Sequence, residues 1–273
     1  MSLRPLALIN QPAGLGDILY TLKIAVNLIR TGFKVIWPVI PEYIWIKRHI
    51  FIEHLSFILP QELNDPLLAE LYTSKICAPY KHSNIYYLPL RYVLHNPSYA
   101  VVELPMFSKY IMADMEEDSF NWWDVYSKSL ILSCDKGKLL YDRIVQYPDY
   151  NIMNSMVGSP DGIHLHTVNP IYNSDINKYH IVPLQILDGF SIFDWYVVLD
   201  RAHQLHTPDT SLCFVVDILR KSIGLCANTR AFMYPRDPNR PNVPLYLTSC
   251  FNFESTGFAG WLFNEGHSQA SIL

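Results

Sequence analysis

The chain has 273 residues, of which 50% are apolar and 17% charged, so it can bury ordinary cores and is not an intrinsically disordered protein. Its 21 Lys and Arg against 25 Asp and Glu give a net charge of −4, and the absence of a basic run argues against nucleic-acid binding. The five cysteines form no Cys-x-x-Cys pair, and no apolar stretch reaches the ~18–20 residues of a membrane span. We therefore expect a cytoplasmic protein without a transmembrane segment.

The N-terminal part alternates between strand and helix patterns. Residues 6–9 and 33–39 are short apolar runs typical of buried strands. Between them, apolar residues recur at helical spacing from Ile18 to Ile29, and Gly32 stands where a C-terminal cap glycine belongs. This pattern predicts a βαβ unit. Further elements are expected as strands at 55–58 and 85–88 and a helix around 66–71.

Two glycines and an aspartate lie between the first strand and the first helix. Gly14 and Gly16 have no Cβ, so the backbone can approach a ligand closely, and a helix start favours anions such as phosphate. Asp17 fits an N-cap, and an aspartate at such a place can also be a base. No Lys-Ser/Thr pair follows Gly16, and the third glycine of a dinucleotide fingerprint is missing.

The rest of the chain divides into a connection and a second α/β half. Residues 111–148 have helix-like spacing and carry an acidic cluster, whereas 149–273 return to alternating strands and helices. We therefore predict an α/β fold with two Rossmann-like halves, 1–110 and 149–273, that face a cleft and are joined by a helical connection, 111–148. In the second half, strands are expected at 150–154, 180–184, 204–207 and 222–227, helices at 193–202 and 212–219, and a terminal helix within 252–265 that packs back across the first half.

A second polar turn stands at the start of a helix in the second half. Asp209, Thr210 and Ser211 follow a short strand and precede a strongly apolar helix. Hydroxyl groups and the free N–H groups of a helix start together suit a diphosphate. The same three residues are also ordinary N-capping residues, and both interpretations stay open.

Two stretches resemble one enzyme family. Gly14-Leu15-Gly16-Asp17-Ile18-Leu19 resembles the G-x-G-D opening of the ADP-heptose:lipopolysaccharide heptosyltransferases, which are GT-B-fold glycosyltransferases. The segment from Ser191-Ile192-Phe193-Asp194-Trp195 to Asp209-Thr210-Ser211-Leu212 is similar to their C-terminal "S…E…A…DTS" stretch. Phe214 replaces the usual histidine, and Asp194 stands where glutamate is common. The activity class therefore carries over better than the heptose donor.

The resemblance implies a metal-independent glycosyltransferase without a cofactor. Its nucleotide-sugar donor would be bound mainly by the C-terminal half, and its glycan or glycoconjugate acceptor would meet the N-terminal half. Asp17 matches the base of an inverting transfer. The expected contacts of the donor phosphates are Gly14, Gly16, Asp209, Thr210 and Ser211. Lys23 and Arg230 are cationic candidates for phosphate or acceptor, and the alternative for both is a solvated surface charge.

Two other functions remain open from the sequence. A nucleotide- or sugar-binding protein of the same fold without catalysis is favoured by the short chain and the missing histidine and disfavoured by the retention of Asp17. A dinucleotide-dependent oxidoreductase is disfavoured because the second strand ends at Trp37-Pro38 without an acidic residue for the ribose. A metal site is not expected, because the pairs His164/His166 and His203/His206 lack a third ligand.

Overall fold

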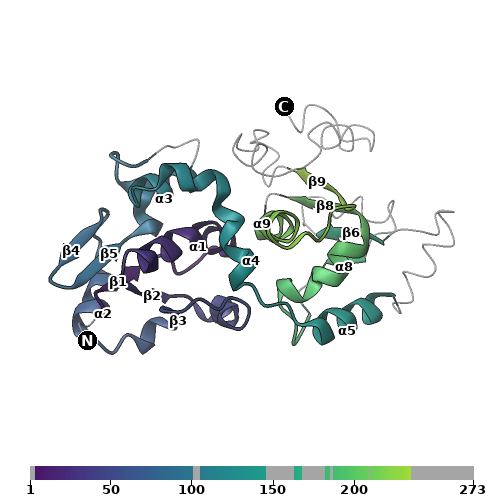
Figure 1. Ribbon diagram of the computed structural model, residues 1–273, viewed down its shortest axis with the longest axis horizontal. Helices are drawn as coiled ribbons and strands as arrows, with labels where there is room; N and C mark the ends of the chain where they lie inside the picture. The colour runs from purple at the N-terminus through teal and green to yellow at the C-terminus, as the bar shows by residue number, and fades with distance from the viewer. Residues whose placement is uncertain are drawn as a thin grey trace. The chain divides into compact units, whose positions relative to one another are not determined.

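The structure is a computed structural model that describes residues 4–100, 105–145, 163–167, 182–184, 187–208 and 210–234. The chain divides into two compact units, Met1–Ile131 and Leu132–Leu273, here called the first and second unit (Figure 1). This division falls inside the stretch 111–148 that the sequence predicts as a connection. The expected strand at 150–154 and the expected terminal helix within 252–265 lie outside the described residues.

The first unit is built on a five-stranded sheet with the order β3-β2-β1-β5-β4. Its strands are β1 (Leu6–Ile9), β2 (Lys34–Pro38), β3 (Leu55–Ile58), β4 (Tyr80–His82) and β5 (Ile85–Leu88). Only β4 is antiparallel, in a hairpin with β5. The strands expected at 6–9, 33–39, 55–58 and 85–88 are confirmed. Ala7, Leu8 and Ile9 are fully buried, as expected for a central parallel strand that is covered on both faces.

Helices and 3-10 turns cover this sheet. They are α1 (Leu15–Arg30), α2 (Pro66–Thr73), α3 (Pro105–Met112) and α4 (Tyr126–Ser129), with the 3-10 segments η1 (Pro41–Arg48), η2 (Pro60–Glu62), η3 (Leu90–His95) and η4 (Glu116–Val125). The helix predicted around 66–71 is confirmed as α2, which starts where the Asp65 side chain accepts the N–H groups of Leu67 and Leu68 at 2.9 and 3.2 Å. Leu68 and Leu71 of α2 pack against Leu8 and Tyr87 in one buried cluster.

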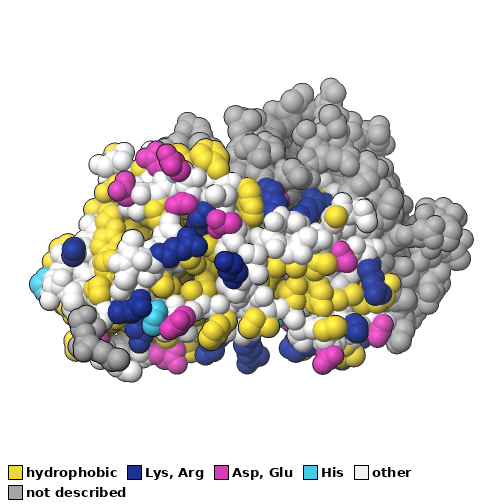
Figure 2. Space-filling model, viewed as in Figure 1, with side chains coloured by type: hydrophobic (Ala, Val, Ile, Leu, Met, Phe, Trp, Pro, Cys, Tyr) yellow, Lys and Arg dark blue, Asp and Glu magenta, His cyan; other side chains and the backbone are white. Residues whose placement is uncertain are grey.

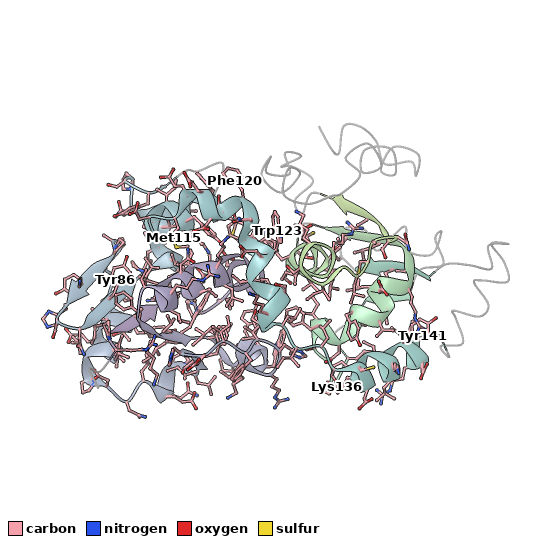
Figure 3. The ribbon with its side chains drawn as sticks, in the orientation of Figure 1. Tyr86, Met115, Phe120, Trp123, Lys136 and Tyr141 are labelled. Atoms are coloured by element: carbon pink, nitrogen blue, oxygen red, sulfur yellow. The ribbon has the colours of Figure 1, made fainter. Side chains whose placement is uncertain are left out.

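Helix α1 is buried on nearly all sides over its first ten residues, because α3 and η4 cover the side that faces away from the sheet. The Tyr110 hydroxyl of α3 donates to the carbonyl of Tyr20 at 2.7 Å, and the Tyr126 hydroxyl donates to that of Leu19 at 2.6 Å. Burial raises the pKa of both phenols well above the usual value, so both keep the proton that they donate. Met115, labelled in Figure 3, accepts a longer contact of 3.7 Å from the Asn27 side chain of α1.

The second unit contains a four-stranded sheet whose paired strands are all parallel, in the order β7-β6-β8-β9. The strands are β6 (Ile163–Thr167), β7 (Val182–Leu184), β8 (Ala202–Pro208) and β9 (Arg230–Tyr234). The helical segments are α5 (Cys134–Val145), η6 (Ile192–Trp195), α8 (Tyr196–Arg201), α9 (Ser211–Ile218) and the π-helical turn η7 (Leu219–Ile223). Two residues of α5 labelled in Figure 3 have partners in this unit: Lys136 donates to the Gly189 carbonyl at 2.9 Å, and the Tyr141 ring lies 4.3 Å from the Arg201 guanidinium.

The strand predicted at 222–227 is wrong. The chain continues from α9 into η7, and Gly224 with φ 79° ends the helical run in the left-handed conformation that favours glycine. The N–H of Leu225 then returns to the carbonyl of Leu219 at 2.9 Å, and the strand β9 starts only at Arg230. The predicted strand at 204–207 is confirmed within β8, and the predicted helix at 193–202 corresponds to η6 and α8.

Each sheet has a point at which its strand order reverses. In the first unit the chain runs from β1 outward through β2 to β3 and then crosses to β5 on the other side of β1. In the second it runs from β6 to β7 and then crosses to β8 on the other side of β6. Open α/β sheets bind ligands outside the carboxyl ends of the strands at such a reversal. The turns that follow β1 and β8 are therefore at the two places where the fold favours binding.

No helix in the described ranges combines the length and the apolar character that crossing a membrane would require.

Candidate active site

The turn after β1 depends on glycine at position 14. Gly14 is the N-cap of α1 and has a φ of 81°, a left-handed conformation that strains other residues. A Cβ at this position would also overlap Oδ2 of Asp17. The carboxylate of Asp17 therefore lies directly against the Gly14 backbone, which is a closer approach than any other residue at position 14 permits. Gly16 is the second residue of α1 rather than part of the turn.

Asp17 is not the N-cap of α1, which corrects one interpretation of the sequence. It is the third residue of the helix, and its Oδ1 pairs with the ammonium of Lys109. A carboxylate in the first turn is stabilised by the partial positive charge of the helix N-terminus. The Asp17 side chain is 34% exposed, so a ligand can reach the carboxylate.

Lys109 approaches Asp17 from helix α3 and is 5% exposed. Its ammonium also donates to Oε1 of Gln11 at 2.8 Å, and the Gln11 amide donates to the carbonyl of Ala13 at 2.5 Å. Burial lowers the pKa of Lys109, while the carboxylate of Asp17 opposes this shift. Lys109 is not among the site residues expected from the sequence. The available signal was that it is the one charged residue in an otherwise uncharged segment, 105–112.

The pair of Asp17 and Lys109 can accept a proton in an ordered way. Lys109 fixes one carboxylate oxygen of Asp17, and among the described residues no hydrogen bond occupies the other oxygen. The carboxylate therefore has one oxygen held by Lys109 and one that lies beside Gly14 without a hydrogen bond, at the strand-order reversal of the sheet.

Lys23 takes a different place from the one expected. It is neither a surface charge nor open to a ligand, because its side chain is 3% exposed and lies between α1 and η4. Its ammonium pairs with Asp118 at 3.0 Å and with Asp124 at 2.8 Å, and it also donates to Asn121. These bonds use the three N–H groups of an ammonium. Lys23 therefore joins two elements of the first unit and is not in contact with Asp17.

The acidic residues between positions 114 and 118 have two different roles. Asp114, Glu116 and Glu117 are exposed, and Figure 2 shows acidic side chains gathered over the region of α3 and η4. Asp118 instead pairs with Lys23 and accepts from the Asn27 amide at 2.8 Å. Part of the cluster is therefore a solvated face, and part of it neutralises a buried cation.

The second turn lies at the carboxyl end of β8. Thr210 is the N-cap of α9 and Ser211 its first residue, and the Thr210 side chain makes no capping hydrogen bond. Its hydroxyl lies instead 3.4 Å from that of Thr207. The first N–H groups of a helix have no intrahelical partner, so the start of α9 can receive an anion. Asp209 lies outside the described residues.

Arg230 is not brought to this turn. It is the first residue of β9 and pairs with Gln204 of β8, whereas Pro208 at the end of β8 pairs with Tyr234. The pair Gln204–Arg230 is four residues along the strands from the pair Pro208–Tyr234, a distance of about 13 Å. The backbone of Arg230 therefore lies toward the amino ends of the parallel strands, at the opposite edge of the sheet from Thr210.

Two positions of the sequence resemblance have local structural roles. Asp194 begins η6 by accepting the N–H of Ser191 at 2.7 Å and its hydroxyl at 2.9 Å. Phe214 is 6% exposed within α9. Among the described residues, no group of three or more His, Cys, Asp and Glu side chains is arranged to hold a metal ion.

No protein-family model and no protein of curated function matches the sequence. Three solved structures of glycosyltransferases are similar at the level of the fold. A glycosyl transferase of family 9 from Veillonella parvula DSM 2008 is 10% identical, with a TM-score of 0.47, over 100% of this chain and 95% of its own. The iron-containing dodecameric glycosyltransferase TibC from enterotoxigenic E. coli H10407 is 11% identical, with a TM-score of 0.45, over 85% of this chain and 58% of its own.

The third is the E. coli heptosyltransferase WaaC with ADP, which is 12% identical, with a TM-score of 0.36, over 98% of this chain and 100% of its own. Similarity at these identities and scores does not assign the chain to a family.

Proposed function

We propose that this protein is a cytoplasmic glycosyltransferase that moves a sugar from a nucleotide-sugar donor to a hydroxyl group of a glycan or glycoconjugate acceptor. The observation that carries the proposal is the carboxylate of Asp17, which lies at the strand-order reversal of the first sheet with one oxygen bound by Lys109. The paired sequence motifs around Gly14 and Thr210 support it. They follow the two strands, β1 and β8, at which their sheets reverse order.

In the proposed reaction the acceptor oxygen attacks the anomeric carbon of the donor sugar, and the bond from that carbon to the diphosphate oxygen breaks. The acceptor proton passes to the open oxygen of Asp17, and the configuration at the anomeric carbon inverts. Lys109 keeps the carboxylate oriented and balances its charge before the transfer.

The departing diphosphate carries the negative charge that develops in this step. The start of α9, with the hydroxyl groups of Thr210 and Ser211, is the proposed place for it, because the helix dipole and open N–H groups favour an anion there. Gly14 and Gly16 belong to the proposed site through the close approach of their backbone. We propose that the reaction needs no metal ion and no cofactor, since these groups supply the stabilisation.

Ligand binding to the intact chain tests the proposal. Nucleoside diphosphates and nucleotide sugars are screened by thermal unfolding in excess EDTA, with each base tested separately. A ligand at 100 times its Kd stabilises the folded state by about 2.7 kcal/mol, which raises Tm by several degrees. We expect one base to raise Tm and the double variant Thr210→Val/Ser211→Ala to lose most of that shift. If no nucleotide raises Tm, or if the shift appears only after magnesium or manganese is added, the proposal is wrong.

A further inference from the structure

A second cation lies at the carboxyl edge of the first sheet, next to the turn that carries Asp17. Arg91 follows β5 in η3, and its N–H donates to the carbonyl of Asn10, the residue after β1, at 3.0 Å. The next residue, Gln11, binds Lys109. Arg91 therefore stands between the ends of β1 and β5, which is where the strand order of this sheet reverses.

Aromatic rings fix the guanidinium of Arg91. Its central carbon lies 4.4 Å from the ring centroid of Tyr92 and 5.7 Å from that of Tyr72, and the guanidinium donates to the Tyr92 hydroxyl. Arg91 is half-buried, and its Nε is fully shielded and has no hydrogen-bond partner among the described residues. Stacking and shielding of this kind hold a guanidinium in one orientation, which favours binding to a planar or tetrahedral anion through two parallel hydrogen bonds.

Arg91 has no carboxylate partner in the described part of the chain, in contrast to three lysines. Lys23, Lys109 and Lys221 each pair with a carboxylate, whereas no carboxylate among the described residues pairs with Arg91. The phenols of Tyr72 and Tyr87 do not replace one, because burial raises the pKa of both and both remain neutral. A half-buried guanidinium without a counter-ion gains a charge-assisted contact when an anion binds.

The neighbouring Asn10 also has a buried polar atom without a hydrogen-bond partner among the described residues. Its side chain is fully buried and donates to the Tyr72 carbonyl at 3.0 Å and to the Tyr87 hydroxyl at 2.8 Å. Its Oδ1 has no partner within the described part of the chain. Buried polar atoms are nearly always hydrogen-bonded. Asn10 and Arg91, which are joined by a backbone hydrogen bond, each depart from this rule with one side-chain atom.

We propose that Arg91 is the centre of an anion-binding site that takes a carboxylate or a phosphate monoester of the acceptor. The assignment to the acceptor rests on the proposed function, in which the first unit binds the acceptor, whereas the anion site itself does not. An acceptor with such a group is placed with its anion at Arg91 and a hydroxyl toward Asp17.

Binding of simple probes to the intact chain tests this site without any transfer reaction. Glucose 6-phosphate supplies a phosphate monoester, glucuronate supplies a carboxylate, and glucose is the neutral control. We expect at least one anionic probe to bind, and Arg91→Gln to weaken it at least tenfold while Arg91→Lys weakens it less. The matched control is Arg30→Gln, which removes one exposed positive charge from the same unit and should leave the affinity unchanged.

Chemical modification of the unaltered protein gives a measurement that does not depend on how the variants fold. Phosphate-bearing probe should slow the reaction of Arg91 with phenylglyoxal, read by mass spectrometry, and should leave that of Arg30 unchanged. The site is refuted if neither probe binds, if Arg30→Gln weakens binding as much as Arg91→Gln, or if Arg91 is not protected. Its assignment to the acceptor is refuted if Arg91→Gln weakens nucleoside diphosphates instead of the sugar probes. Probe binding in a chain that binds no nucleotide leaves the anion site in place and rejects the proposed transfer.

Discussion

At the scale of single residues, the candidate site depends on the contact between Gly14 and Asp17. The carboxylate occupies the space where a side chain at position 14 would begin, and Lys109 keeps it there. The positions of Gly14 and Asp17 could be predicted from the sequence, because a strand, a glycine turn and a helix are adjacent along the chain. The pairing of Asp17 with Lys109 could not, because the two residues are 92 positions apart and the packing of α3 on α1 brings them together.

Gly14→Ala tests this contact. The left-handed φ costs a residue with a Cβ about 1–2 kcal/mol, and we expect a further loss because the Cβ displaces the Asp17 carboxylate from its place beside Lys109. The matched control is Gly32→Ala in the same unit, since Gly32 has a φ of 103° and nothing within 4 Å of an added Cβ. Chemical denaturation of both variants measures the difference. Equal losses of unfolding free energy would mean that the carboxylate does not lie against Gly14.

Arg91 lies at a place that a sequence can indicate, just beyond the end of a predicted strand. The strand at 85–88 was predicted, and residues just beyond the carboxyl end of a strand are candidates for binding. The missing information was that β5 lies directly beside β1, which periodicity does not reveal.

At the scale of elements, α1 is joined to η4 through Lys23. Both carboxylates that neutralise this ammonium come from η4, so the ion pairs set the position of η4 over the helix. The sequence predicts a ligand-binding or surface cation at Lys23, because this residue lies a turn or two after Asp17. Its place along the chain does not reveal that a segment about a hundred residues later covers this face of α1.

Lys23→Met tests that role. Removing one partner of a shielded ion pair costs about 3 kcal/mol or more when the remaining charges are buried. Here Asp118 and Asp124 are 35% and 46% exposed, so we expect about 2 kcal/mol. Lys34→Met is the matched control, because Lys34 is an exposed lysine at the start of β2 and should change the unfolding free energy by less than about 0.5 kcal/mol. A Lys23 variant as stable as the Lys34 variant would contradict this account of η4.

Helix α9 contains a buried carboxylate, Asp217, that makes the stability of the folded protein depend on pH. Asp217 has a fully shielded side chain, and although Lys221 pairs with it at 2.8 Å, burial raises the pKa of Asp217 from 3.8 to about 6. Between these two pH values the folded protein binds the proton more tightly than the unfolded chain does. The contribution of this group to stability is therefore present at low pH and is lost as the pH rises from about 4 through 6.

Asp217→Asn should remove this dependence. The shift corresponds to roughly 3 kcal/mol, so we expect the variant to gain stability over the unaltered protein as the pH rises through 6, and the difference to level off at about that size above pH 7. Unfolding followed by denaturant at several pH values between 4 and 8 measures it. Asp135→Asn removes an exposed carboxylate of the same unit and serves as the control. A difference that does not change with pH would show that Asp217 is not held protonated by burial.

At the scale of the whole molecule, the two units share one organisation. Each has a mainly parallel sheet whose strand order reverses next to its first strand, and each carries a turn and a helix start at that reversal. The alternation of strands and helices predicted two α/β halves from the sequence. The strand order could not be predicted. The bounds of β9 differ from the strand expected at 222–227, and because Arg230 begins β9 it lies at the amino edge of the sheet, whereas Thr210 lies at the carboxyl edge.

Turnover of a nucleotide sugar by the intact chain and by Asp17→Asn tests glycosyl transfer most directly. The donor is the one selected by thermal unfolding, EDTA is present throughout, and release of the nucleoside diphosphate is measured. The amide of the variant still accepts the bond from Lys109 but cannot take the acceptor proton. We therefore expect donor affinity to change little and turnover to fall ~10²–10⁴-fold. Glu116→Gln, which neutralises an exposed acid of the same unit, should turn over at the unaltered rate. A folded Asp17→Asn variant that releases the nucleoside diphosphate as fast as the unaltered protein, or an unaltered protein that releases none, would contradict the assignment.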